Sequence, residues 1–225
     1  MSVTGIDGCR GGWVAVTLTT AGTRVTVART LGELALDELG LDGMAGITGI
    51  DMPLGLLGAG WRTADLLARR ALGRRGSCVF AIPPRPVWNA PDYPAANRLC
   101  RELTGGGMSA QAWGLRAKLL EADLFQRSPA PARLYEVHPE LSFAALAGEP
   151  LAATKHSEAG LAMRRALLAR AGITLPARVP GAALDDVLDA AAVAWSARRI
   201  AAGTAVTLTD PAQHADDGAE IGIWY

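Results

Sequence analysis

Cysteine and histidine are scarce in this chain of 225 residues, and their scarcity argues against two classes of site. The three cysteines, Cys9, Cys78 and Cys100, are far apart and form no Cys-x-x-Cys pair, and there are three histidines. Structural zinc sites use closely spaced cysteines and histidines, and disulfide frameworks use several cysteines. We therefore expect neither, and the cysteine usage favours a reducing compartment.

The chain also lacks an excess of charge of either sign. Its 22 Lys and Arg residues balance 22 Asp and Glu residues, so any affinity for nucleic acid must come from local basic patches. No run approaches the ~20 apolar residues that a membrane helix needs. The first residues do not have the basic and apolar regions of a signal peptide. We therefore expect a cytoplasmic protein that does not bind membranes.

Hydrophobic residues are plentiful, at 50% of the chain, which is enough for a sizeable core. Segments rich in Val and Thr, joined by short turns that contain glycine, predict three antiparallel strands at 3–9, 12–20 and 24–31. The remaining pattern predicts a helix at 32–41, strands at 45–52 and 133–139, an edge strand in the final IGIWY, and helices at 63–73, 93–103, 109–127, 140–148, 157–171 and 184–202. Residues 76–92 and 104–107, rich in glycine and proline, are expected to form loops. Strands that then alternate with helices indicate an α/β fold with one mixed sheet.

Two short segments of this pattern repeat each other, and each ends in an acid. Gly5-Ile6-Asp7 and Gly49-Ile50-Asp51 both stand near the end of an expected strand. A helical crossover between these strands would make them parallel, so their carboxyl ends would meet at one edge of the sheet. Ligand sites of open α/β sheets lie outside that edge. We therefore expect Asp7 and Asp51 to lie close together.

A third group of acids opens the apolar helix expected at 184–202. Asp185, Asp186 and Asp189 fall within an arc of roughly 100° on that helix. Aspartate in a first turn also caps a helix and complements its dipole, so capping is one explanation of this group. The other explanation is that the acids bind a cation.

Additional candidates come from the strand at 133–139, where Glu136 and His138 share a face because side chains alternate along a strand. Carboxylates held together repel one another unless they are protonated or bind a cation. A site with only oxygen ligands suits Mg²⁺ or Mn²⁺ rather than Zn²⁺. A pair of such ions can activate water and stabilise the leaving oxygen in phosphodiester cleavage. The acids therefore point to a metal-dependent hydrolase.

Several stretches of the chain together resemble a known family of predicted RNase H-like nucleases, the domain of unknown function 429 family. They span nearly the whole chain: GIDGCRGGWVAV, GIDMPLGL, ARRALGRRGSCVF, GGGMSAQAWGLRAKLLEAD, YEVHPELSF and DDVLDAAAVAWSA. The resemblance implies an RNase H-like fold, with a mixed five-stranded sheet in which three antiparallel N-terminal strands are followed by parallel strands, flanked by helices. It further implies a single domain over residues 1–225 with a helical insertion at about 61–130.

The resemblance also implies roles for the acids. Asp7 corresponds to the metal ligand of the first strand, and Asp51 stands where RuvC-type resolvases keep a second acid, which in them is a glutamate. Asp186 and Asp189 match the D-x-x-D-A of the last helix, so these four acids are the expected catalytic set. Asp185 and Glu136 are added as possible further ligands of Mg²⁺ or Mn²⁺.

Substrate contacts are expected from a basic segment and from several polar residues. Residues 61–85 contain six arginines and one acid, a composition that suits contacts to the phosphates of RNA or DNA. A solvated helix face explains the same arginines equally well. The expected substrate-binding residues are Arg62, Arg74, Arg75, Arg85, Gln111, His138 and Lys155.

Two other functions are compatible with the same residues. GIDGCRGGW resembles the phosphate-binding hairpin of actin-like ATPases and sugar kinases, which suggests a phosphotransferase or ATPase. A non-catalytic module that binds nucleic acid through the arginine segment is the second alternative. The sequence predicts no particular oligomeric state.

Overall fold

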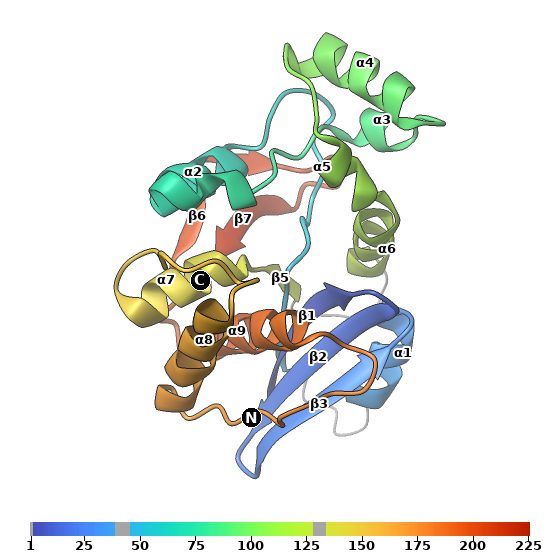
Figure 1. Ribbon diagram of the computed structural model, residues 1–225. Helices are drawn as coiled ribbons and strands as arrows, with labels where there is room; N and C mark the ends of the chain where they lie inside the picture. Colours follow the sequence, from blue (N-terminus) through green and yellow to red (C-terminus); the bar gives the residue numbers. More distant parts are fainter. Residues whose placement is uncertain (1, 39–45, 128–133) are drawn as a thin grey trace. The chain divides into compact units, whose positions relative to one another are not determined.

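The computed structural model describes residues 2–38, 46–127 and 134–225, and the chain forms two compact units (Figure 1). Unit 1 comprises Met1–Met52, Ser128–Val206 and Trp224–Tyr225; unit 2 comprises Pro53–Arg127 and Thr207–Ile223. The insertion expected at about 61–130 falls in unit 2 as far as Arg127, and its last residues, 128–130, lie outside the described residues.

Unit 1 is built on a mixed five-stranded sheet in the order β3-β2-β1-β4-β5. Its strands are β1 (Val3–Cys9), β2 (Gly12–Thr19), β3 (Gly22–Ala28), β4 (Ile47–Ile50) and β5 (Leu134–Glu136). The first three pair antiparallel, whereas β4 is parallel to β1 and β5 is parallel to β4. This confirms the expected α/β class and is consistent with an RNase H-like fold.

The helices of unit 1 are α1 (Leu31–Glu38), α7 (Pro139–Ala147), α8 (Glu158–Arg170) and α9 (Leu184–Ala201). Helix α9 packs against β1, β2 and β4, and α7 and α8 pack against α9 (Figure 1). The core between α9 and the sheet combines valines and leucines of the strands with the alanines of α9. The apolar character of the 184–202 segment is explained by this position, since α9 is covered by the sheet and by two helices.

Unit 2 is mainly helical. It contains α2 (Thr63–Leu72), the 3₁₀ helix η1 (Gly73–Cys78), α3 (Arg85–Trp88), α4 (Tyr93–Thr104), α5 (Ala110–Gly114) and α6 (Arg116–Gln126). A two-stranded sheet of β6 (Thr207–His214) and β7 (Glu220–Trp224) completes it, except that Trp224 belongs to unit 1. None of the helices in residues 2–38, 46–127 and 134–225 is long and apolar enough to cross a membrane.

The structure differs from the sequence-based expectation in four places. The expected helix 109–127 is two helices, which meet at Leu115, directly after Gly114. The expected loop 76–92 contains the end of η1 and the short α3, and β6 was not expected. The expected C-terminal edge strand exists as β7; it pairs with the unexpected β6, and Trp224 forms an isolated parallel bridge with Val137, the residue after β5. Of the expected elements, residues 39–41, 45 and 133 lie outside the described residues.

Candidate metal centre

Three acids from three separate elements meet at the carboxyl-terminal edge of β1 and β4. Asp7 lies on β1, Asp51 follows β4, and Asp189 lies on α9. One oxygen from each carboxylate can be chosen so that all three lie within 4.8 Å of one another. The convergence expected from the two Gly-Ile-Asp segments is therefore found, because β1 and β4 are parallel and the Asp51 N–H donates to the Ile6 carbonyl at 2.8 Å.

Glycine on the strands allows α9 to come close enough for Asp189 to join the other two acids. A Cβ at Gly5 would lie 2.1 Å from the Ala194 nitrogen and 2.2 Å from the Ala190 carbonyl oxygen. A Cβ at Gly49 would lie 2.8 Å from a methyl carbon of Val193. The helix therefore rests directly on the backbone of β1, and its first turns lie beside Asp7.

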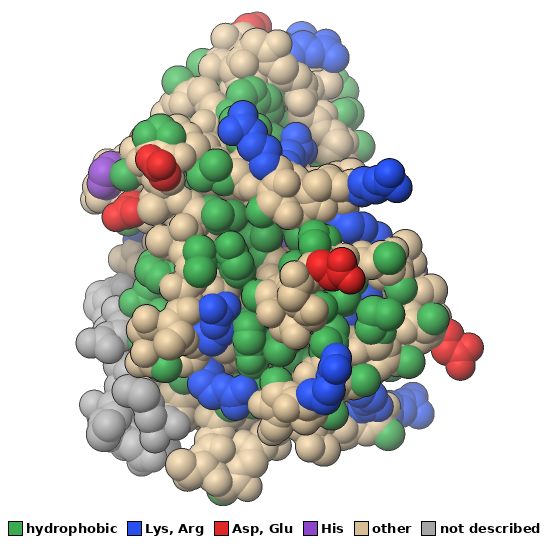
Figure 2. All heavy atoms as spheres, turned by 90° about the vertical axis from the view of Figure 1, so that its left-hand side faces the viewer, with side chains coloured by type: hydrophobic (Ala, Val, Ile, Leu, Met, Phe, Trp, Pro, Cys, Tyr) green, Lys and Arg blue, Asp and Glu red, His purple; other side chains and the backbone are tan. Residues whose placement is uncertain are grey.

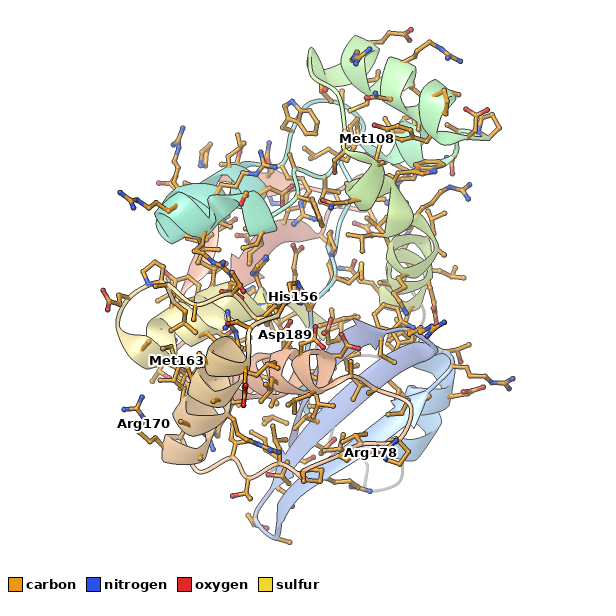
Figure 3. All side chains as sticks on the ribbon, in the orientation of Figure 1. Met108, His156, Met163, Arg170, Arg178 and Asp189 are labelled. Atoms are coloured by element: carbon orange, nitrogen blue, oxygen red, sulfur yellow. The ribbon has the colours of Figure 1, made fainter. Side chains whose placement is uncertain are left out.

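Lys155 supplies positive charge to this cluster. It lies in the segment between α7 and α8, and its Nζ donates to Asp189 Oδ2 at 2.7 Å. Figure 3 labels its neighbour His156 together with Asp189. The other oxygen, Asp189 Oδ1, is buried and has no hydrogen-bond partner among the described residues. Asp7 Oδ1 accepts a bond of 2.6 Å from the Gly8 N–H.

Burial and mutual repulsion make these acids unusually basic. Burial, followed by the charges of Asp51 and Asp189, raises the pKa of Asp7 well above its usual value. Burial raises the pKa of Asp51 to about 7, and that of Asp189 to about 6, although the charge of Lys155 opposes both shifts. Burial lowers the pKa of Lys155, but the charge and hydrogen bond of Asp189 outweigh this effect and raise it. Lys155 therefore stays charged, whereas the acids keep their protons to a higher pH than ordinary carboxyl groups do.

These shifts predict how stability depends on pH when no metal is bound. A carboxyl group whose pKa is raised on folding stabilises the protein below its unfolded pKa, and this contribution disappears as the pH rises through the folded pKa. For Asp51 the window runs from about 4 to about 7. We expect Asp51→Asn to raise the melting temperature, less at pH 5 than at pH 8, by about 2–4 °C for each kcal/mol that burial of the charged carboxylate costs.

Thermal melts in EDTA at the two pH values measure this effect. Glu149→Gln is the matched control, because Glu149 is an exposed acid of unit 1 outside the cluster. A lower melting temperature for Asp51→Asn at pH 8 would show that the charged carboxylate stabilises the empty site.

A buried ion pair supports the segment that carries Lys155. Arg164 of α8 is fully buried, and its Nη2 donates to Glu140 Oε1 of α7 at 2.5 Å. Its Nη1 donates to the Ala153 carbonyl at 3.1 Å, two residues before Lys155. Glu140 also lies near the cluster, since its charge raises the pKa of both Asp51 and Asp189. Sequence reasoning did not single out this pair, although Arg164 stands on the apolar face of α8, four residues before the buried Leu168.

The other acids expected as ligands lie around the cluster. The charge of Asp186 contributes to the raised pKa of Asp7. Asp185 Oδ2 lies 3.7 Å from Nδ1 of the exposed His156. Glu136 is buried at the end of β5, opposite Ile50. Among the described residues, the acids whose oxygens converge within 4.8 Å are Asp7, Asp51 and Asp189, and ligand roles for the other three remain predictions.

His138 and Lys155, two of the expected substrate-binding residues, lie in unit 1. His138 is the N-cap of α7, where its Nδ1 accepts from the Glu140 N–H at 3.3 Å. Lys155 was expected to contact phosphate, and the structure pairs it with Asp189.

The other expected substrate-binding residues lie in unit 2. Arg62 is 1% exposed and pairs with Asp65, and Arg85 makes two hydrogen bonds to Asp123 and one to Asp216. Arg74 and Arg75 lie on η1, and Gln111 is exposed on α5. On the face shown in Figure 2, Lys and Arg side chains are mostly separated by hydrophobic or uncharged ones. Substrate contacts by these residues remain predictions.

The fold and the site define an α/β protein with a carboxylate cluster at the edge of a mixed five-stranded sheet. The chain belongs to the family described as Protein of unknown function (DUF429), which matches residues 5–214. This confirms the family resemblance drawn from the sequence motifs. No curated protein and no solved structure matches the chain.

Proposed function

We propose that the protein is a divalent-metal-dependent nuclease that hydrolyses phosphodiester bonds of RNA or DNA. The observation that carries this proposal is the convergence of Asp7, Asp51 and Asp189 within 4.8 Å, on elements far apart in the sequence. Three carboxylates brought together in a buried position repel one another and leave a place for a cation. Capping explains a first-turn aspartate on one helix, but it does not explain acids that arrive from two strands.

The residues present fit a hard divalent cation. The cluster offers carboxylate oxygens alone, the ligand set that Mg²⁺ and Mn²⁺ prefer. Asp189 Oδ1 is buried without a hydrogen-bond partner among the described residues, and such an atom normally has one. A bound cation would satisfy it. Asp7, Asp51 and Asp189 would therefore hold the ion.

Lys155 gives the two oxygens of Asp189 different roles. Its Nζ holds Oδ2 and thereby fixes the carboxylate plane, which leaves Oδ1 for the ion. Because its side chain is 34% exposed, Lys155 also offers positive charge to a phosphate that approaches from solvent. A divalent ion in such a site supplies electrostatic stabilisation of the charge that develops on a phosphodiester during hydrolysis.

Exposed arginines in unit 2 support nucleic acid as the substrate. Arg69, Arg70 and Arg74 are exposed near the end of α2 and the start of η1. Guanidinium groups in such a cluster suit contacts with successive phosphates. The chain carries no net charge that would attract nucleic acid as a whole, so this local group is the basis of the assignment.

Metal binding is the first test, and calorimetric titration with Mn²⁺ measures it. We expect the wild-type protein to bind Mn²⁺ with release of protons, because carboxyl groups with raised pKa values must ionise. Asp189→Asn and Asp7→Asn should abolish the binding. Glu149→Gln, which removes an exposed acid of the same unit, should bind as the wild type does.

Cleavage is the second test, with labelled single- and double-stranded RNA and DNA in Mg²⁺ or Mn²⁺. Cleavage that EDTA and Asp189→Asn both abolish supports the proposal. Cleavage by a folded, metal-supplied Asp189→Asn variant at the wild-type rate would defeat it. Hydrolysis of ATP without cleavage of nucleic acid would favour the phosphotransferase or ATPase alternative, and the absence of any response to metal would favour a non-catalytic binding module.

A further inference from the structure

Unit 2 contains two adjoining hollows that the metal centre does not use. The first has a volume of about 370 Å³, and the second about 480 Å³. Arg69, Phe80 and Ser109 line both, so the two hollows lie next to each other. Small-molecule sites in proteins commonly have volumes of about 300–1,000 Å³, which places each hollow in the range of a mononucleotide-sized ligand.

The first hollow has an aromatic and apolar lining with a rigid wall. Trp61, Leu66, Phe80 and Met108 contribute large apolar side chains. The wall is the glycine-rich loop before α5, in which the Met108 N–H donates to Asn97 Oδ1 and the Met108 carbonyl accepts from the Tyr93 hydroxyl, both at 3.0 Å. This loop is therefore held in place before any ligand arrives.

Two glycines pack closely in this wall. A Cβ at Gly107 would lie 2.7 Å from Asn97 Oδ1, and a Cβ at Gly106 would lie 3.3 Å from the Trp61 ring. The backbone of the loop thus packs directly against the ring and the amide that shape the hollow. Of the Gly-Gly-Gly run at 105–107, Gly107 lines the first hollow, whereas Gly105 ends α4 in the left-handed conformation.

Arg69 brings positive charge to the junction of the two hollows. Its Nε donates to the Val79 carbonyl at 2.8 Å, which orients the guanidinium. Its two Nη groups have no hydrogen-bond or ion-pair partner within residues 2–38, 46–127 and 134–225. An oriented guanidinium with two unused donor groups matches the geometry of a phosphate oxygen pair.

We propose that these hollows bind a nucleotide, with the base against Trp61 and Phe80 and the phosphate on Arg69. Aromatic side chains stack on any base, and guanidinium groups bind phosphate, so the lining is complementary to both parts of the ligand. Gln111 lines the second hollow and offers an amide donor and acceptor to the ligand there. The site lies within unit 2 and shares Arg69 with the arginine group of the proposed nuclease, but it uses none of the three clustered acids, so it can be tested without metal.

Calorimetric titration with 5′-AMP and 5′-UMP in EDTA tests the proposal, because EDTA removes any contribution of the metal centre. We expect both to bind. Arg69→Gln should weaken the binding about tenfold or more, as the loss of charged hydrogen bonds predicts. Phe80→Leu, which keeps an apolar side chain but removes the ring, should weaken it about tenfold. Arg98→Gln is the matched control, since Arg98 is an exposed arginine of α4 in the same unit and lines neither hollow.

A second titration, with the trinucleotide UpUpU, distinguishes a free mononucleotide from a nucleotide within a single strand as the ligand. Tighter binding of the trinucleotide than of 5′-UMP supports a nucleotide within a single strand, whereas its exclusion supports a free mononucleotide. The proposal is overturned if neither ligand binds, or if a folded Arg69→Gln variant binds them as the wild type does. Because both titrations are carried out without metal, their outcome does not depend on the outcome of the Mn²⁺ and cleavage tests.

Discussion

Gly5→Ala is expected to destabilise the protein by about 3 kcal/mol or more, the upper part of the range for an overfilled core. The added Cβ would lie 2.1 Å from the Ala194 nitrogen and 2.2 Å from the Ala190 carbonyl oxygen. Both are backbone atoms inside α9, so no side chain can rotate away to make room. Relief requires α9 to move away from β1, which separates Asp189 from Asp7. Urea unfolding and Mn²⁺ calorimetry together measure the two effects.

Gly11→Ala is the control for this substitution. Gly11 lies in the exposed turn between β1 and β2, and a Cβ there meets no atom within 4 Å. We expect its stability to stay within about 0.5 kcal/mol of the wild type. A Gly5→Ala protein with wild-type stability would contradict the close contact between β1 and α9.

Arg164→Met is expected to cost about 3–5 kcal/mol, because it leaves the carboxylate of Glu140 buried without its partner. Both side chains are buried, and the ion pair between them is 2.5 Å long. The substitution also removes the hydrogen bond to the Ala153 carbonyl, which restrains the segment that carries Lys155. Metal-free thermal melts should therefore show a decrease of roughly 10 °C for a chain of this size.

A double-mutant cycle separates the ion pair from simple loss of packing. Glu140→Leu combined with Arg164→Met removes both charges, and it should restore much of the stability that Arg164→Met loses. Arg170→Met on the same helix is the surface control, since Arg170 is exposed (Figure 3) and should change stability by less than about 0.5 kcal/mol. Equal losses in the single and double variants would contradict a buried ion pair.

The parts of the site that lie on regular elements were predictable from local pattern. Asp7 and Asp51 each follow a Val-, Ile- or Thr-rich segment that can only be a strand, and the crossover rule then brings their ends together. Asp189 was expected from its position on the first turns of an apolar helix. These inferences succeeded because they need the direction of each element and not the details of packing.

The contacts of loops were not predictable in the same way. Lys155 precedes Asp189 by 34 residues and lies in a segment without periodicity, so nothing local orients its side chain. It was singled out as a possible phosphate ligand, whereas its partner in the structure is a carboxylate. The Arg164–Glu140 pair was missed because it joins two helices whose mutual packing depends on tertiary structure.

Strand β6 was missed for a different reason. Its sequence TLTDPAQH is polar and contains Pro211, features that argue against a strand inside a sheet. It pairs with β7, and α2 packs on it. A strand of a two-stranded sheet tolerates proline because one of its edges needs no partner, and sequence pattern does not show which strands have such an edge.

The meeting of helix and strand at Gly5 has a consequence for how accurately the ligands are placed. At Gly5, main-chain atoms of α9 contact main-chain atoms of β1, so no flexible side chain separates the helix that carries Asp189 from the strand that carries Asp7. The distance between the two acids therefore depends on Gly5, a position at which a side chain larger than a hydrogen atom would push the helix away from the strand.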